Sequence, residues 1–218
     1  MTVILRSEVP GRSSGVAVLL HGFTRRPHHL APLSGALQAA GVSTLRVGLG
    51  ALWWPTSTNN ASHLTRVAAT IAAEVASAPC VVVGHSAGAA AGAWIAAELR
   101  RTGVHMRGLV MVDGVESPTR LIERAWPGLG GMPVRAVAAP PSRCNRDGRL
   151  TAWLQGRPDV DIVLVPGSGH GDIEGGPTAI YRWGCGDASS PETRDTVTSL
   201  TVGFARVLLA TPLMPPDR

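Results

Sequence analysis

The chain has 218 residues, of which 44% are hydrophobic and 16% are charged. This length predicts one domain with a substantial core, and the composition excludes a disordered chain. The formal net charge is +5, and all 20 basic residues are arginine. The lack of lysine excludes Schiff-base chemistry, pyridoxal phosphate enzymes and the lysine of a nucleotide-binding P-loop.

Composition also limits the expected partners and location. The arginines are scattered and are not interleaved with aromatic residues, so we expect no nucleic-acid partner. No run of about 18 apolar residues is present, so we expect no membrane partner. The first residues lack the basic and apolar pattern of a secretion signal, which favours a cytoplasmic location.

Cysteine usage argues against a disulfide scaffold or a zinc module. Cys80, Cys144 and Cys185 are widely spaced and form no C-x-x-C pair, although a single bridge between Cys144 and Cys185 stays open. No H-E-x-x-H motif indicates a metal, and no G-x-G-x-x-G motif opens a helix after a strand. We therefore expect neither a metal nor another cofactor.

Short β-branched segments alternate along the chain with longer alanine-rich segments, a pattern typical of a parallel sheet with crossover helices. The predicted strands cover residues 2–9, 16–21, 43–47, 80–84, 108–113, 134–138 and 161–166. The predicted helices cover residues 29–40, 61–76, 87–101, 119–126, 149–155 and 192–209. We expect an α/β fold with a mostly parallel central sheet and helices on both faces. It should form a single domain over residues 1–218, with 211–218 as a frayed tail.

The strongest functional motif is Gly84-His85-Ser86-Ala87-Gly88, which follows an apolar predicted strand and precedes a predicted helix. A serine in a tight strand-to-helix turn has its hydroxyl exposed at the carboxyl end of the sheet, and the glycines leave room for that turn. The first N–H groups of the helix point toward the serine. The motif predicts a nucleophilic Ser86; the alternative is a tight turn with a spectator serine.

Three motifs together resemble the α/β-hydrolase family. The segment His21-Gly22-Phe23 is similar to the family's H-G-F segment, residues 84–88 to its nucleophile elbow, and residues 163–172 to the strand and loop that carry its catalytic histidine. The resemblance implies the α/β-hydrolase fold and an oxyanion hole formed by the backbone N–H groups of Phe23 and Ala87. The alternative for residues 21–23 is a strand-ending turn with His21 packed inside.

His170 is the preferred general base among the seven histidines. It follows an apolar strand and lies in a glycine-rich loop that can bring it over the end of the sheet. Its expected task is to take the proton of Ser86 and return it to the leaving group.

The acid is less clearly defined by the sequence. Asp113 ends an apolar strand at the same sheet edge as Ser86, and Val112-Asp113-Gly114 resembles the acid position of chlorophyllases and related lidless hydrolases. Asp147 follows the next strand, where many α/β-hydrolases keep their acid, but arginines surround it, which favours a surface or turn role. We favour Asp113 and keep Asp147 as the alternative. Asp172 is too close to His170 in sequence to be the first choice.

Substrate signals are fewer. The segment between Asp113 and Val134 is too short for a helical cap, so we expect an open site with a minimal cap or none. Trp53 and Trp54 lie in the loop after the third predicted strand, at the edge where substrates bind in such folds, and predict an apolar wall. The alternative is simple loop packing. By topology, Trp126 and Trp183 lie in neighbouring loops and could extend this wall, whereas Trp94 is expected in the core.

These features predict a serine esterase or thioesterase that cleaves a small-molecule acyl ester or thioester through a Ser-His-Asp triad and an acyl-enzyme. Two alternatives stay open. An acyltransferase or cyclase would use the same residues with a different acceptor. A binding protein or a non-hydrolytic protein would have the same fold but would not use Ser86 to cleave an ester.

Overall fold

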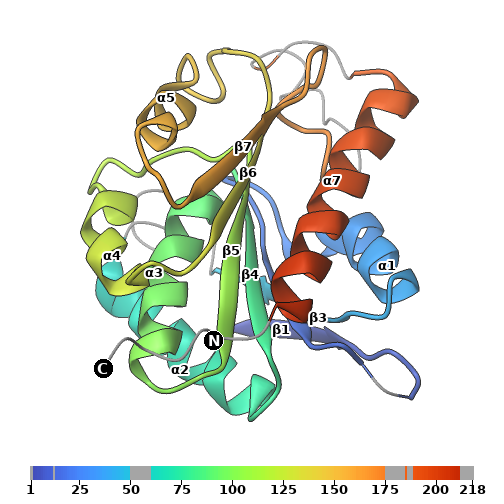
Figure 1. The fold of residues 1–218 in the computed structure, drawn as a ribbon, viewed down its shortest axis with the longest axis vertical. Helices are drawn as coiled ribbons and strands as arrows, with labels where there is room; N and C mark the ends of the chain where they lie inside the picture. The colour runs from blue at the N-terminus through green and yellow to red at the C-terminus, as the bar shows by residue number, and fades with distance from the viewer. Residues whose placement is uncertain (1, 12, 50–59, 175–184, 186–188, 212–218) are drawn as a thin grey trace.

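The computed structural model describes residues 2–11, 13–49, 60–174, 185 and 189–211. Within them it contains a seven-stranded sheet with the strand order β1-β3-β2-β4-β5-β6-β7 (Figure 1). Only β1 runs antiparallel to its neighbour. The strands are β1 Val3–Ser7, β2 Val16–Leu20, β3 Ser43–Gly48, β4 Cys80–His85, β5 Met106–Val112, β6 Val134–Ala138 and β7 Val160–Leu164.

Helices cover both faces of this sheet, as Figure 1 shows. A cluster of buried apolar side chains joins one face to α2 (Ala61–Val75), α3 (Ala87–Arg101), α4 (Leu121–Leu129) and α5 (Arg149–Gln155). A second cluster joins the other face to α1 (Ala31–Ala39) and α7 (Pro191–Ala210). The strands β2 and β4 are buried along their whole length because both of their faces are covered. The expected α/β fold is confirmed.

Two helices begin two residues later than predicted. The predicted helix 29–40 is divided into a short 3-10 helix, Pro27–Leu30, and α1, which begins at Ala31. The reason is Pro32, which has no N–H to donate and is tolerated only in the first turn of a helix. The prediction 119–126 corresponds to α4 at 121–129, because Arg120 has a left-handed backbone with φ +56° and precedes the helix.

The segment between β5 and β6 does not form a cap over the carboxyl end of the sheet. It forms α4, which packs on α3 beside the sheet. In the ranges that the structure describes, no helix is long and apolar enough to cross a membrane.

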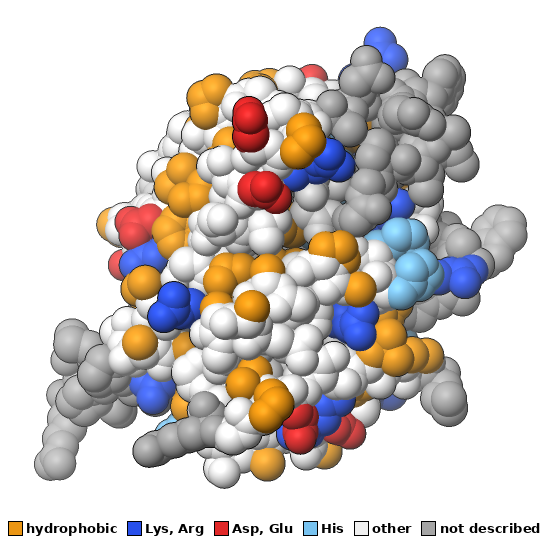
Figure 2. All heavy atoms as spheres, turned by 90° about the vertical axis from the view of Figure 1, so that its right-hand side faces the viewer, with side chains coloured by type: hydrophobic (Ala, Val, Ile, Leu, Met, Phe, Trp, Pro, Cys, Tyr) orange, Lys and Arg blue, Asp and Glu red, His pale blue; other side chains and the backbone are white. Residues whose placement is uncertain are grey.

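The side of the molecule over α7 and α1 has a mixed surface. Hydrophobic, basic and acidic side chains are intermingled on the described part of this side (Figure 2). A nucleic-acid partner would favour a continuous basic stripe. The expectation of no such partner stays a prediction.

Candidate active site

Ser86 lies in the sharp turn between β4 and α3, with φ +53° and ψ −124°. A residue other than glycine rarely adopts this backbone conformation, so the surrounding structure must stabilise it. The two glycines of the motif provide the space. A Cβ added at Gly84 would lie 2.4 Å from the carbonyl oxygen of Gly88, and one added at Gly88 would lie 2.5 Å from that of Leu20. Larger residues at either position would push α3 away from the sheet.

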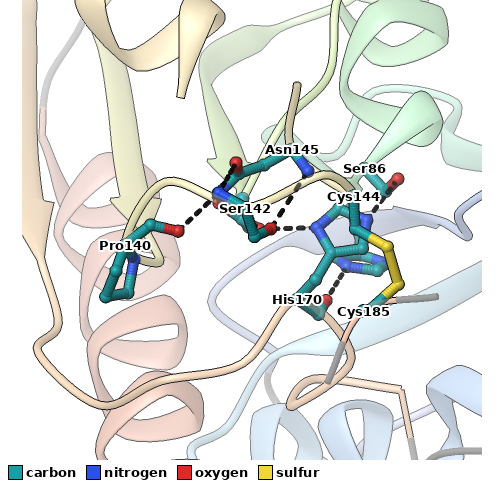
Figure 3. Close-up of a disulfide and its surroundings, with 9 residues drawn as sticks. Ser86, Pro140, Ser142, Cys144, Asn145, His170 and Cys185 are labelled. Atoms are coloured by element: carbon teal, nitrogen blue, oxygen red, sulfur yellow. Dashed lines mark hydrogen bonds and ion pairs between the residues drawn. A yellow bond between two sulfur atoms is a disulfide. The ribbon is translucent and has the colours of Figure 1, made fainter. Parts of the chain in front are cut away.

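The structure brings Ser86 together with His170, which the loop after β7 carries across the edge of the sheet. The Oγ of Ser86 lies 2.8 Å from Nε2 of His170, and the two side chains point toward each other in Figure 3. Both residues are buried, at 6% exposure each. This is hydrogen-bond distance for proton transfer from a serine hydroxyl to an imidazole.

Asp113 completes a hydrogen-bonded chain from the end of β5. Its Oδ2 accepts a hydrogen bond from Nδ1 of His170 at 2.5 Å, and its Oδ1 accepts one from the backbone N–H of Ala139 at 3.1 Å. Its φ of +40° turns the carboxylate toward the histidine immediately after the strand. The alternative acid, Asp147, is exposed and lies in a turn. Asp172 is engaged locally, because its Oδ2 accepts the N–H of Gly169 at 2.7 Å.

Asn145 also contacts the acid, a role that the sequence reasoning missed. Its Nδ2 donates to Oδ1 of Asp113 at 3.1 Å, while its Oδ1 accepts the N–H groups of Ser142 at 2.8 Å and Gly148 at 3.0 Å. The two backbone donors fix the orientation of the amide, so that its N–H groups face the carboxylate. The sequence shows an asparagine in a turn-forming segment after β6, which does not by itself predict a contact with Asp113.

The pKa shifts of His170 and Asp113 agree with the hydrogen-bonded arrangement of Ser86, His170 and Asp113. Burial lowers the pKa of His170 below its ordinary value, and the hydrogen bond that His170 donates to Asp113 only partly offsets this. Burial alone would raise the pKa of Asp113, but the hydrogen bond and charge of His170, together with Asn145, bring it below its ordinary value. At neutral pH the imidazole of His170 is therefore neutral and lies next to the ionised carboxylate of Asp113.

The turn after β2 lies against Ser86. A Cβ added at Gly22 would lie 3.1 Å from Cβ of Ser86, so this glycine permits the close approach. Phe23 follows in the turn and is 41% exposed, and Ala87 is the first residue of α3, where a backbone N–H has no partner within the helix. His21 is buried, and its Nδ1 lies 2.8 Å from the carbonyl oxygen of Gly22.

A disulfide joins Cys144 to Cys185 close to this site. It links the loop after β6, which contains Asn145, to a part of the chain that follows His170 (Figure 3). Of the three cysteines, Cys80 is free and buried. The bridge that the sequence left open is present in the structure.

Of the tryptophans that the sequence places in or near an apolar substrate wall, the structure describes Trp126. Trp53, Trp54 and Trp183 lie outside the described residues. The expectation that Trp126 lies in a loop at the sheet edge was wrong. Trp126 is in α4 and packs edge-to-face on Trp153 of α5, with ring centroids 5.0 Å apart, because the helix continues past Pro127.

Within the described ranges, no group of three or more His, Cys, Asp and Glu residues is arranged to hold a metal ion. A small cavity of about 10 Å³ contacts Asp113 and His170.

Solved structures share this architecture. They include Est1E from Butyrivibrio proteoclasticus with bound ferulic acid, at 14% identity over 96% of both chains and a TM-score of 0.68. A monoacylglycerol lipase from Paleococcus ferrophilus has 14% identity over 95% of this chain and 99% of its own, with a TM-score of 0.69. A dienelactone hydrolase from Anabaena variabilis has 17% identity over 89% and 87%, with a TM-score of 0.64. The chain has the α/β-hydrolase fold. No protein-family model and no curated protein sequence matches it.

Proposed function

We propose that the chain is a serine hydrolase that cleaves a carboxylic ester or thioester through an acyl-enzyme. The observation that carries this proposal is the continuous hydrogen-bonded chain from Ser86 through His170 to Asp113. A nucleophile, a neutral base and an ionised acid in this order form the arrangement that activates serine in unrelated hydrolases. Several proteins of the same fold carry the names of hydrolases, including a lipase and a dienelactone hydrolase, which adds support.

The geometry suggests the following steps. Ser86 attacks the acyl carbonyl carbon while His170 takes the hydroxyl proton on Nε2, and Asp113 stabilises the imidazolium that forms. The backbone N–H groups of Phe23 and Ala87 stabilise the oxyanion, each by about 3 kcal/mol in the transition state. His170 then protonates the leaving alcohol or thiol. Water, deprotonated by His170, attacks the acyl carbon of the acyl-enzyme, and His170 gives this proton to the Ser86 oxygen as the carboxylic acid is released.

The nucleophile is tested by Ser86→Ala. We expect it to lower the hydrolysis of short p-nitrophenyl esters by about a millionfold and to abolish labelling by a fluorophosphonate probe. The matched control is Ser62→Ala, which removes an exposed hydroxyl on α2. Near wild-type turnover by a folded Ser86→Ala protein would reject the mechanism.

The acid is tested by comparing two aspartates. Asp113→Asn removes the charge next to His170, and we expect a loss of about ten-thousandfold in kcat. Asp147→Asn changes an exposed side chain and should leave kcat close to wild type. The reverse result would assign the acid to Asp147.

The acceptor is a separate question, because the same residues would serve acyl transfer or cyclisation. The expected product is the free acid. Product analysis with and without a competing alcohol or amine checks this, and a dominant transfer product would assign the chain to the transferases.

The cytoplasmic location stays a proposal. The disulfide between Cys144 and Cys185 bears on it, because structural disulfides persist mainly in oxidising compartments. Alkylation of free thiols in intact cells should modify both cysteines if the protein is cytoplasmic. Protection of the pair would place the protein in an oxidising compartment.

A further inference from the structure

A buried carboxylate lies beneath the candidate active site and takes no part in the hydrogen-bonded chain of Ser86, His170 and Asp113. Glu174, four residues after His170, is fully buried. Its Oε1 accepts the backbone N–H of Gly22 at 2.6 Å and lies 2.9 Å from Nδ1 of His85, and its Oε2 accepts Nε of Arg25 at 3.0 Å. The side chains of Arg25 and His85 are each 2% exposed. The carboxylate therefore accepts two hydrogen bonds, lies at ion-pair distance from His85, and has no contact with bulk water.

The contacts of His85 define its protonation state. Its Nε2 lies 2.6 Å from the carbonyl oxygen of His170, which can only accept, so Nε2 must carry a proton. Its Nδ1 faces the carboxylate of Glu174, which also accepts. One ring nitrogen therefore donates to a carbonyl oxygen and the other lies at ion-pair distance from a carboxylate, an environment that stabilises the charged imidazolium form of His85. Burial alone would lower its pKa, but the charge and hydrogen bond of Glu174 raise it above the ordinary value.

We propose that Glu174 and His85 are positioning residues for the reaction, and that their buried ion pair fixes the turn after β2, the nucleophile elbow and the loop of His170 relative to one another. This inference rests on the proposed function of the same site. Glu174 holds the turn through Gly22 and Arg25, and His85 holds the loop through the carbonyl oxygen of His170. His85 is itself covalently linked to Ser86, so the pair connects nucleophile, base and oxyanion turn.

The pair connects segments that are far apart in sequence. Gly22 and Glu174 are separated by 152 residues. The strands that precede their loops, β2 and β7, are not neighbours in the described sheet, so sheet hydrogen bonds do not fix the two loops relative to each other. Neutral side chains could pack the same volume, and a buried ion pair is costly to form because both groups lose hydration. Its advantage here is directional: each charged group accepts or donates several hydrogen bonds in a fixed geometry.

The cation also acts on the base. The rings of His85 and His170 lie 5.0 Å apart, and the positive charge of His85 lowers the pKa of His170. The other charged or titratable groups that act on these rings are Glu174, Asp113 and the imidazole of His21, with Arg25 on the far side of the carboxylate. Glu174 opposes the effect of His85 on His170, but more weakly. The pair therefore favours a neutral, proton-accepting His170.

The first test does not depend on catalysis. In the nitrogen-15 NMR spectrum of the labelled protein, we expect both ring nitrogens of His85 to be protonated at pH 7, with the signals assigned by their loss in His85→Gln. In Glu174→Gln the remaining His85 signals should show a single ring proton at the same pH. A neutral His85 in the wild-type protein would overturn the proposal whether or not the protein is a hydrolase.

The second test separates positioning from a structural role. Glu174→Gln should lower kcat for a p-nitrophenyl ester by about a hundredfold, the cost of a small misplacement of reacting groups, with KM nearly unchanged. His85→Gln should in addition move the acidic limb of the kcat/KM profile to higher pH, because the charge that lowers the pKa of His170 is gone. The control is Glu98→Gln, which breaks only the pair of Glu98 with Arg101 on α3. Glu98→Gln should change neither kcat nor the midpoint of the acidic limb of the kcat/KM profile.

The outcomes are distinguishable. If the wild-type protein hydrolyses esters and His85→Gln leaves both kcat and the acidic limb unchanged, the ion pair does not position the site. If Glu174→Gln unfolds, His85→Gln and the NMR state of His85 still decide. If no ester is cleaved and Ser86 is not labelled, the proposed function fails, while the NMR test still decides whether the buried cation exists.

Discussion

The protonation state of one imidazole controls the proposed reaction. Burial lowers the pKa of His170 below the ordinary value of 6.5 for histidine. As the pH falls through this pKa, the ring gains a proton and can no longer accept one from Ser86. The rate is therefore lost on the acid side of this value and retained above it.

We expect the acidic limb of kcat/KM to have its midpoint below pH 6.5. The measurement is hydrolysis of an ester whose leaving group does not titrate, followed across the range in which the protein stays folded by circular dichroism. A midpoint above the ordinary histidine value would mean that the carboxylates around the ring outweigh burial.

At this scale the sequence predicts the residues that lie in motifs and misses those that depend on distant contacts. Ser86 and His170 follow apolar strands in recognisable turns, so their places at the sheet edge could be inferred. Asn145 and Glu174 have no such pattern. Asn145 gains its role from Asp113, and Glu174 gains its role from the turn after β2 and from His85, partners that only the folded chain brings near.

The packing of α3 on the sheet depends on how closely the backbone of the helix can approach that of β2. The start of α3 contacts β2 at Gly88, where an added Cβ would lie 2.5 Å from one backbone oxygen and 2.6 Å from another. Backbone atoms of a central strand cannot move aside as a flexible side chain can. The glycine is therefore required by packing as well as by the turn.

Gly88→Ala should lower the free energy of unfolding by about 3 kcal/mol, through overpacking against the strand. Gly35→Ala is the matched control, because Gly35 is an exposed residue of α1 with no atom within 4 Å of an added Cβ. It should raise stability by about 1 kcal/mol, the usual gain of alanine over glycine in a helix. Urea denaturation measures both, and equal effects would show that the contact at Gly88 is unimportant.

The disulfide constrains the loop that contacts the acid. Cys144 and Cys185 are separated by 41 residues, and Asn145 follows directly. Replacing both cysteines by serine should lower the free energy of unfolding by up to about 4 kcal/mol, because the unfolded chain regains freedom. Reductant should have a similar effect on the wild-type protein and none on the double variant. A reductant effect on the variant would point to another cause.

Across the whole molecule, the fold follows from periodicity. The alternation of short β-branched and longer alanine-rich segments predicted a sheet covered by helices on both faces, and the complete burial of β2 and β4 agrees with it. The element boundaries were less predictable, because they depend on single residues such as Pro32 and Arg120. Trp126 was misplaced for a similar reason, since the proline after it does not end α4.

The buried pair of Glu174 and His85 also affects the stability of the molecule as a function of pH. Burial would raise the pKa of Glu174, but His85, the N–H of Gly22 and Arg25 lower it to about 2 from 4.5. Its stabilisation is therefore present above pH 4.5 and is lost as the pH falls toward about 2. The pKa of His85 is raised above 6.5, so its contribution is complete below that value and is lost as the pH rises through the raised pKa.

The difference in unfolding free energy between the wild-type protein and Glu174→Gln should be largest between pH 4.5 and 6.5. It should shrink as the pH approaches 2, where the wild-type carboxyl is itself neutral. Urea denaturation at a series of pH values measures the difference. A constant offset at every pH would show that the pair adds no charge-dependent stability.

The groups around Ser86 come from turns that follow β2, β4, β5, β6 and β7, so no early portion of the polypeptide carries a working set. A nascent chain on the ribosome should therefore not hydrolyse esters before β7 and the loop of His170 have emerged, even if much of the sheet has formed. Turnover can thus serve as a reporter of complete folding, and a refolding time course followed by ester cleavage should lag behind one followed by secondary structure.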